Sequence, residues 1–324
     1  MMGKENLHVP IGDAERIEIT TVIDNYSDHT LAMTETPSEM IKRASWAMEE
    51  RIPDEALLAE HGLSLLVKVF KGDKHHSILL DAGWSRIGVP HNMRMLGINA
   101  SRIEAVVISH GHMDHFGALL EILWDLVSPD VPLIIHPDAF LPRVLSLSSG
   151  KRIKMPRLDE GEVENADSGL IKTKRPHPLA SGLVFSLGEV ERNTDFEKGL
   201  AGALIERKGE WEPDLIMDDQ GLVMNIKGKG LVVITGCAHA GIINTIRHAR
   251  KITGINTVYA VMGGFHLTGP QFMPITERMI QELKKINPSV IVPMHCTCWR
   301  ATNLIAEEFP DQFILNSVGT TFSF

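Results

Sequence analysis

Three imidazoles and one carboxylate stand within six residues in the segment His110-Gly-His112-Met-Asp114-His115. A short β-branched apolar run before it predicts a buried strand, and an apolar run after it predicts a helix. His110 and His112 are two residues apart, so both leave an extended backbone on the same side. Asp114 and His115 diverge slightly and can reach a second point nearby. The segment therefore suits two adjacent metal ions; the alternatives are a histidine-rich surface loop or residues that cap the helix.

The spacing His-x-His-x-Asp-His after a strand resembles the signature of the metallo-β-lactamase superfamily. Three further segments resemble strand ends of that superfamily: Leu79-Leu-Asp81-Ala-Gly83, Leu231-Val-Val-Ile-Thr-Gly236 and Val290-Ile-Val-Pro-Met-His295. The resemblance implies an α/β (α+β) fold, a four-layer αββα sandwich. It also implies two divalent metal ions, with zinc as the first expectation and manganese or iron as alternatives.

The remaining metal ligands should lie at strand ends on the same rim of the sandwich. His295 resembles the last histidine of the second site. The superfamily usually has a bridging aspartate after a Thr-Gly pair of this kind, but Cys237 follows Thr235-Gly236 here. His239 could replace the third histidine of the first site, and Cys237 is either a thiolate ligand or a buried neutral thiol. The expected ligands are His110, His112, Asp114, His115, His239 and His295.

Other polar residues near these strand ends are candidates for supporting roles. Asp81 is expected to orient a metal-bound histidine through a hydrogen bond. Asn25 could contact substrate or cap a turn. His266 follows two glycines and is a catalytic candidate that could contact substrate or metal, or be a structural histidine. Asp114 is the second catalytic candidate, because it could accept a proton from the nucleophile while it binds metal.

Composition limits the partners of the chain. Its 324 residues carry a formal net charge of −9, which argues against nucleic acid as the main partner. No stretch approaches the ~20 apolar residues of a membrane span, and the N-terminus lacks the apolar core of a signal peptide. With only three cysteines, a cytoplasmic location is the default expectation. The expected partner is a small anionic molecule, and the sequence leaves the oligomeric state open.

The predicted elements fit one domain over residues 1–324. Two insertions interrupt it. The first, at about 28–62, contains a predicted helix that is either a lid or a peripheral packing helix. The second, at about 142–181, is expected to be largely irregular. Strands are predicted at 16–24, 64–70, 77–81, 105–109, 183–187, 203–206, 222–226, 231–235, 257–262, 289–293, 312–315 and 320–324. Helices are predicted at 37–50, 116–124, 242–252, 276–286 and 301–309.

Three functions remain open at this point. The first is a metal-dependent hydrolase of a small anionic ester or phosphoester, because bound zinc lowers the pKa of water to about 7. The second is a dihydropterin transferase that releases diphosphate, since these motifs and the segment Glu191-Arg-Asn-Thr-Asp-Phe-Glu197 resemble a subgroup with such a member. Trp84, Phe265 and Trp299 could stack on a pterin, or simply pack. The third is a non-catalytic or redox metal protein. The di-iron members of the superfamily that do redox chemistry carry His-x-Glu-x-Asp, whereas this chain has His110-x-His112-x-Asp114.

Overall fold

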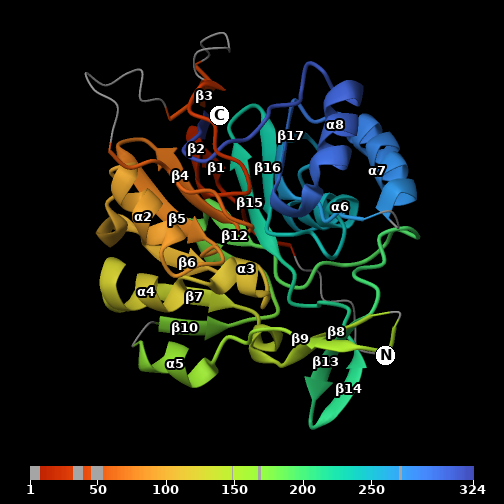
Figure 1. Ribbon diagram of the computed structural model, residues 1–324. Helices are drawn as coiled ribbons and strands as arrows, with labels where there is room; N and C mark the ends of the chain where they lie inside the picture. The colour runs from red at the N-terminus through yellow and green to blue at the C-terminus, as the bar shows by residue number, and fades with distance from the viewer. Residues whose placement is uncertain (1–7, 32–38, 45–53, 148, 167–168, 270–271) are drawn as a thin grey trace.

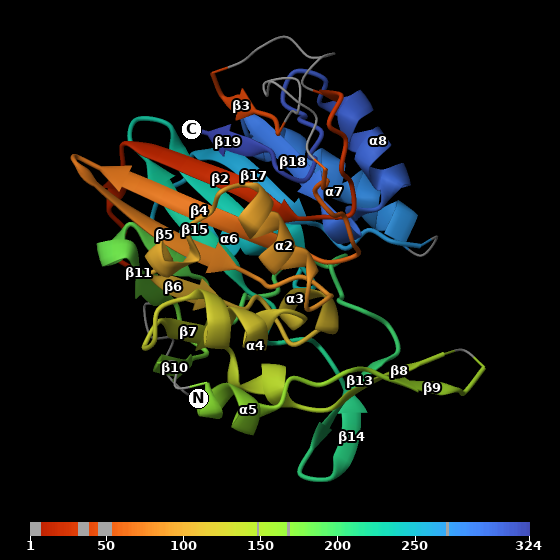
Figure 2. The ribbon, with the colours of Figure 1, turned by 60° about the vertical axis from the view of Figure 1, so that its left-hand side comes forward.

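The computed structural model describes residues 8–31, 39–44, 54–147, 149–166, 169–269 and 272–324. Two β-sheets pack face to face, and helices cover their outer faces (Figures 1 and 2). Apolar side chains of both sheets share one buried cluster between the layers. Three further clusters join the sheets to their own helices, one on the first sheet and two on the second. The predicted αββα sandwich is therefore confirmed.

The eight-stranded sheet carries the first half of the chain. In spatial order it contains β10 (Gly169–Lys172), β7 (Pro132–Ile135), β6 (Ala105–Val107), β5 (Lys74–Leu80), β4 (Ser64–Lys71), β2 (Arg16–Ile23), β19 (Thr321–Ser323) and β3 (Ile41–Lys42). Alternation in β4 sends Leu65 and Val67 between the sheets and Leu66 toward the helices. Because β5 and β6 are parallel, the residues that follow them meet at one edge.

The seven-stranded sheet carries most of the second half. Its path is β11 (His177–Leu179), β12 (Val184–Ser186), β15 (Gly221–Ile226), β16 (Gly230–Thr235), β17 (Val258–Gly264) and β18 (Val290–Met294), and β1 (Asp13–Ala14) pairs with β15. β16, β17 and β18 are mutually parallel neighbours. Their carboxyl ends therefore lie side by side, which brings distant segments of sequence to one rim.

The helices lie on the two outer faces. α2 (Gly88–Met95), α3 (Met113–Phe116) and α4 (Leu119–Glu121) cover the eight-stranded sheet, and α6 (Ile242–Thr253), α7 (Met273–Ile286) and α8 (Trp299–Glu308) cover the other. The helix predicted at 116–124 is broken at Gly117, and a π-helical turn follows at Ile122–Leu126. The break arises because Gly117 N–H donates to Gly83 O, and a Cβ at Gly117 would lie 1.8 Å from Trp84 O.

Three predicted elements differ from the structure. Residues 142–181 are not largely irregular: they form β8 (Arg143–Ser146), β9 (Arg152–Lys154), α5 (Glu160–Asn165), β10 and β11. The regularity comes from partner strands distant in sequence, which local patterns do not reveal. Of the helix predicted at 37–50, the described residues 39–44 contain strand β3 instead, and the rest lies outside the described residues. Residues 312–315 make only an isolated bridge, between Phe313 and Ile291.

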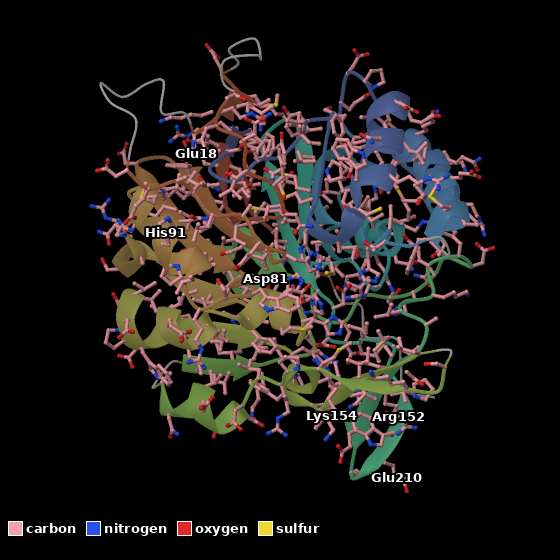
Figure 3. The ribbon with its side chains drawn as sticks, in the orientation of Figure 1. Glu18, Asp81, His91, Arg152, Lys154 and Glu210 are labelled. Atoms are coloured by element: carbon pink, nitrogen blue, oxygen red, sulfur yellow. The ribbon has the colours of Figure 1, made fainter. Side chains whose placement is uncertain are left out.

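A third sheet of four strands projects from the sandwich. Its order is β14 (Glu210–Pro213), β13 (Ala203–Arg207), β8 and β9. Figure 3 shows Arg152, Lys154 and Glu210 on this projection, well away from Asp81 at the centre of the molecule. Within the described ranges, no helix combines the length and apolar character needed to cross a membrane.

Candidate metal centre

The carboxyl ends of five strands, two from one sheet and three from the other, converge on one rim of the sandwich. Asp81 follows β5, and the histidine segment follows β6. Cys237 and His239 follow β16, His266 follows β17 and His295 follows β18. The structure thus brings together all six expected ligands and the two candidate supporting residues Asp81 and Cys237.

The ligand atoms fall into two neighbouring groups. Atoms of Asp114, His115, Cys237 and His295 lie within 4.8 Å of one another, as do those of His110, Cys237 and His239. All of these side chains are buried except that of Asp114, which is 13% exposed.

His112 joins the second group through its neighbours. His110 Nε2 lies 2.9 Å from His112 Nδ1, and the His112 and His239 ring centroids are 4.9 Å apart. In the first group, His295 Nε2 lies 3.2 Å from Asp114 Oδ2 and His115 Nε2 lies 3.2 Å from Cys237 Sγ. Two sets of nitrogen, oxygen and sulfur ligands therefore stand next to each other.

The donor set fits divalent cations. His112 Nε2 and both ring nitrogens of His239 are buried and have no hydrogen-bond partner in the described part of the chain. Buried polar atoms without partners are costly, and a bound cation would satisfy them. Imidazole, carboxylate and thiolate together are the ligands of zinc and related transition metals.

Burial and mutual repulsion control the protonation of these groups. Burial lowers the pKa of His112 to about 4, and burial with repulsion from His115 holds the pKa of His110 well below its usual range. His115 is the exception: burial opposes its charge, but Asp81 and Asp114 raise its pKa to about 9. Burial also raises the pKa of the Cys237 thiol well above its usual range.

Several residues of the rim have left-handed backbone conformations. The φ angle is +63° at Asp81, +54° at Ala238, +46° at His266 and +49° at His295. Non-glycine residues in this region cost conformational energy, and such residues cluster at functional sites. The fold therefore holds these side chains in orientations that a relaxed backbone would not give.

Asn25 is exposed at the rim, directly after the first long strand, and lies beside His295. Its side-chain amide donates to the backbone oxygen of His295 at 2.8 Å. The adjacent Asp24 accepts the His295 N–H at 2.9 Å and the Asn316 amide at 2.6 Å. The pair therefore fixes the backbone of His295, which explains why polar residues end the first long strand.

A buried arginine supports the peptide between His110 and His112. Arg143 donates to Asp214 at 2.8 Å and to Asp218 at 2.6 Å, and Asp218 in turn accepts the Gly111 N–H at 2.8 Å. A Cβ at Gly111 would lie 2.2 Å from Ala139 O, so the peptide passes where only glycine fits. Sequence reasoning missed this network, because its members are up to 107 positions apart.

The segment Glu191–Glu197 supports the start of α6. Glu197 accepts the N–H groups of Ile243 and Asn244, both at 2.9 Å, at the first turn of the helix. Burial raises the pKa of Glu197 to about 6, despite these bonds. Arg192 donates to the backbone oxygen of His239 at 3.2 Å. The segment therefore holds the loop that carries Cys237 and His239.

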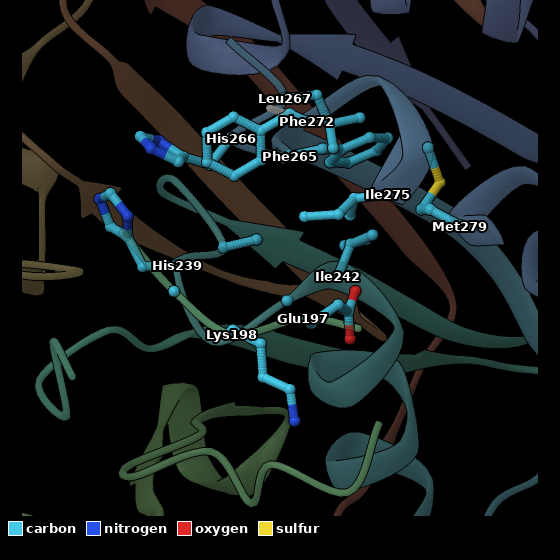
Figure 4. Close-up of a pocket in the computed structure, with 13 residues that line it drawn as sticks. Glu197, Lys198, His239, Ile242, Phe265, His266, Leu267, Phe272, Ile275 and Met279 are labelled. Atoms are coloured by element: carbon cyan, nitrogen blue, oxygen red, sulfur yellow. The ribbon is translucent and has the colours of Figure 1, made fainter. Parts of the chain in front are cut away.

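His266 lies beside the ligand groups. Its ring centroid is 4.1 Å from that of His239, and its ligand atom lies within 4.8 Å of those of Cys237 and Cys296. Figure 4 shows the rings of His239 and His266 at one end of a pocket and Ile275 and Met279 at the other. The cavity there measures about 20 Å³, which is the room of roughly one water molecule.

Sequence reasoning also missed His61. This residue lies in the segment before β4, and its Nε2 is 3.7 Å from Asp114 Oδ2. Its ring centroid is 4.8 Å from that of His295 and 6.1 Å from Trp84, and its side chain is 57% exposed. No strand end or motif marks His61. The available clue is the pair Glu60-His61 directly before a predicted strand.

The aromatic residues expected near the rim differ in their surroundings. Trp84 is 44% exposed and lies beside His61, whereas Phe265 is buried in the core under α6 and α7. Trp299 is 75% exposed at the start of α8. Of the three, Trp84 is the one whose ring lies beside an exposed histidine of this region, His61.

Comparisons with known proteins agree with this geometry. The family description "Metallo-beta-lactamase superfamily" matches residues 59–196. The chain is 32% identical over 262 residues to the 7,8-dihydropterin-6-methyl-4-(β-D-ribofuranosyl)-aminobenzene-5′-phosphate synthase of Methanocaldococcus jannaschii, covering 79% of this chain and 87% of the relative. An uncharacterized protein of the same organism is 29% identical over 265 residues, covering 81% and 92%.

A solved structure extends the similarity to the whole fold. The crystal structure of a metal-dependent hydrolase of the β-lactamase superfamily superposes with a TM-score of 0.72 and 25% identity. The superposition covers 94% of this chain and 98% of that one. From the curated relative, the family match and the shared fold, the chain belongs to the metallo-β-lactamase superfamily.

Proposed function

We propose that this chain is a metal-dependent hydrolase that cleaves a small anionic ester or phosphoester at a pair of divalent cations. One observation carries the proposal: two sets of buried ligand atoms lie side by side, and several of their nitrogens lack any partner among the described residues. Such atoms are costly to bury unpaired, and a bound cation would satisfy several of them at once.

The residues divide into two cation positions. His110, His112 and His239 would hold one, and Asp114, His115 and His295 the other, with Cys237 within reach of both. Divalent cations held there would act as Lewis acids on an ester or phosphoryl oxygen. Zinc suits this mixture of nitrogen, oxygen and sulfur best, and iron or manganese are alternatives.

The chain's own residues would orient the substrate. The cavity beside His239 and His266 is too small for more than a water-sized group. The exposed side chain of His61 lies next to Asp114, and the exposed Trp84 lies beside His61. A substrate therefore approaches from the side of His61, where an imidazole N–H can donate to an anionic oxygen, and Asp114 is placed to accept a proton.

Metal analysis combined with a phosphodiester assay tests the proposal. The wild-type chain should contain two divalent metal ions and cleave bis(p-nitrophenyl) phosphate. His112→Ala should lose metal and activity while its circular dichroism spectrum stays native. His75→Ala, a change at an exposed position on β5, is the matched control and should keep both. Full metal retention in His112→Ala would contradict the ligand assignment.

A dihydropterin transferase is the second candidate. It is supported by the 32% identity to the synthase of Methanocaldococcus jannaschii over most of both chains. The same cations would then hold a diphosphate leaving group, and an arylamine would take the place of water as nucleophile. Incubation with a dihydropterin methyl diphosphate and the ribofuranosyl aminobenzene phosphate distinguishes the two. Diphosphate release with a coupled product in the mass spectrum favours the transferase, and phosphodiester cleavage without coupling favours the hydrolase.

A further inference from the structure

The sulfur of Cys237 lies where the ligand groups meet. In the described part of the chain, three sets of candidate ligand atoms each lie within 4.8 Å of one another, and Cys237 belongs to every set. The sets are Asp114, His115, Cys237 and His295; His110, Cys237 and His239; and Cys237, His266 and Cys296. A single atom that reaches both cation positions is a candidate for binding both.

The loop around Cys237 is tightly packed against its neighbours. A Cβ at Gly236 would lie 2.1 Å from Ser109 Oγ, and one at Gly264 would lie 3.2 Å from the Cys237 Cα. Cys237 itself is 2% exposed, and its Sγ is 3.2 Å from His115 Nε2. Nitrogen and sulfur ligands of one tetrahedral zinc ion lie about 3.6 Å apart, from bond lengths of about 2.0–2.1 and 2.3 Å. The observed separation is about 0.4 Å shorter than this spacing, so only a small outward movement would make the two atoms ligands of one cation.

The surroundings of Cys237 are those of a ligand and not of a packing residue. A buried thiol that only fills space sits among apolar side chains. Cys237 instead adjoins imidazoles, and both nitrogens of the buried His239 have no hydrogen-bond partner among the described residues. Cys298 lies outside the three sets, with its Sγ 3.3 Å from Leu267 O, and Cys296 belongs to the third set alone.

We propose that the Cys237 thiolate is a ligand shared by both cations and that it sets which metals the chain accepts. This inference rests on the cation pair of the proposed function. Metal binding would break the S–H bond, form sulfur–metal bonds and release one proton to solvent. A thiolate favours zinc, iron(II) and cobalt(II) over the harder manganese and magnesium ions. Cys237 would therefore select against the cations that an all-oxygen bridge accepts.

X-ray absorption at the zinc edge of the wild-type holoprotein tests the shared ligand without any substitution. A thiolate bound to both ions gives about one sulfur neighbour per zinc at roughly 2.3 Å. A thiolate on one ion gives an average of half a sulfur per zinc and overturns the shared role, and no sulfur overturns ligation altogether. Metal content is measured on the same sample, so two zinc ions without sulfur would sink this inference and leave the proposed function intact.

Substitutions then identify which sulfur is involved. In the cobalt(II) form, Cys237→Ser should lose the near-ultraviolet thiolate-to-cobalt absorption, and the matched control Cys298→Ser, at a thiol outside the three sets, should keep it. Loss of the band in Cys296→Ser but not in Cys237→Ser would overturn the assignment. Cys237→Asp places oxygen where sulfur stood, and we expect it to keep two metal ions and to bind manganese about tenfold more tightly relative to zinc. An unchanged manganese-to-zinc preference would contradict the selective role. A wild-type chain with two metals and the sulfur signal but no turnover would sink the proposed function alone.

Discussion

Asp81 and His115 are both fully buried, and Asp81 Oδ2 lies 2.7 Å from His115 Nδ1. The same oxygen accepts the Ser109 hydroxyl at 2.8 Å, and Oδ1 accepts the Ser109 N–H at 2.7 Å. Because Asp81 binds Nδ1, Nε2 of His115 is the nitrogen left to face Asp114 and Cys237. One carboxylate thus joins the end of β5 to both the strand β6 and the histidine segment after it.

Replacing Asp81 should weaken metal binding without rearranging the backbone. Asn tolerates the left-handed conformation found at this position, where φ is +63°. Asp81→Asn removes the negative charge that orients His115, and the expected loss of metal affinity is about 10–100-fold. Competition with a chelator measures this loss. Affinity equal to that of the wild type would show that Asp81 has no part in holding the metal.

Glu197 should make stability depend on pH. Its pKa is raised to about 6 in the folded chain by burial, above the ordinary value of 4.5. The folded state therefore keeps a proton that the unfolded state has lost, and this contribution falls as pH rises from about 4.5 through 6. The expected change is on the order of 2 kcal/mol.

Urea unfolding of Glu197→Gln beside the wild type measures this contribution. The variant cannot titrate at this position. Between pH 4.5 and 7 the free energy of unfolding of the wild type should therefore fall relative to that of the variant. Parallel pH profiles for the two proteins would refute a raised pKa at Glu197.

Arg143 should be far more important for stability than an exposed arginine. It is 4% exposed and paired with Asp214 and Asp218. Arg143→Met leaves two buried carboxylates without a countercharge, and the expected loss in the free energy of unfolding is about 3–5 kcal/mol. Arg278→Met breaks an ion pair at the surface and is the matched control, with no comparable loss. Chemical denaturation compares the two variants. Equal losses would show that the Arg143 network contributes no more to the free energy of unfolding than a surface ion pair does.

His61 should affect substrate binding but not metal content. Its side chain is 57% exposed and 3.7 Å from Asp114, on the open side of the centre. His61→Ala removes a hydrogen-bond donor to an anionic substrate, and we expect the KM for a phosphodiester to rise about tenfold. Steady-state kinetics and elemental analysis on the same preparation check this. Loss of a metal ion from His61→Ala would instead make His61 a ligand.

The sequence was sufficient to predict the parts of this molecule that local patterns encode. The histidine segment, the apolar strands before Asp81, Cys237 and His295, and the long helix α6 all have a period or spacing that is visible over a few residues. The resemblance to a known superfamily then supplied the layer arrangement. These are the elements whose positions the structure confirms.

Contacts between distant segments could not be predicted in the same way. Arg143 reaches Asp218 across 75 positions, and the segment with His61 reaches Asp114 only after the sheet has formed. Residues 142–181 have weak periodicity because their short strands are stabilised by partners elsewhere in the chain. These strands form only against their partners in the folded sandwich, so no short window of sequence reveals them.

The link between β10 and β11 has a mechanical consequence. Thr173 donates its N–H to Ile135 O of one sheet, and the next residue, Lys174, accepts from Glu189 N–H beside the other sheet. The peptide groups of two adjacent residues therefore hydrogen-bond to the margins of both sheets. Along this margin the two sheets are therefore tied by backbone hydrogen bonds of adjacent residues, in addition to the apolar cluster that they share.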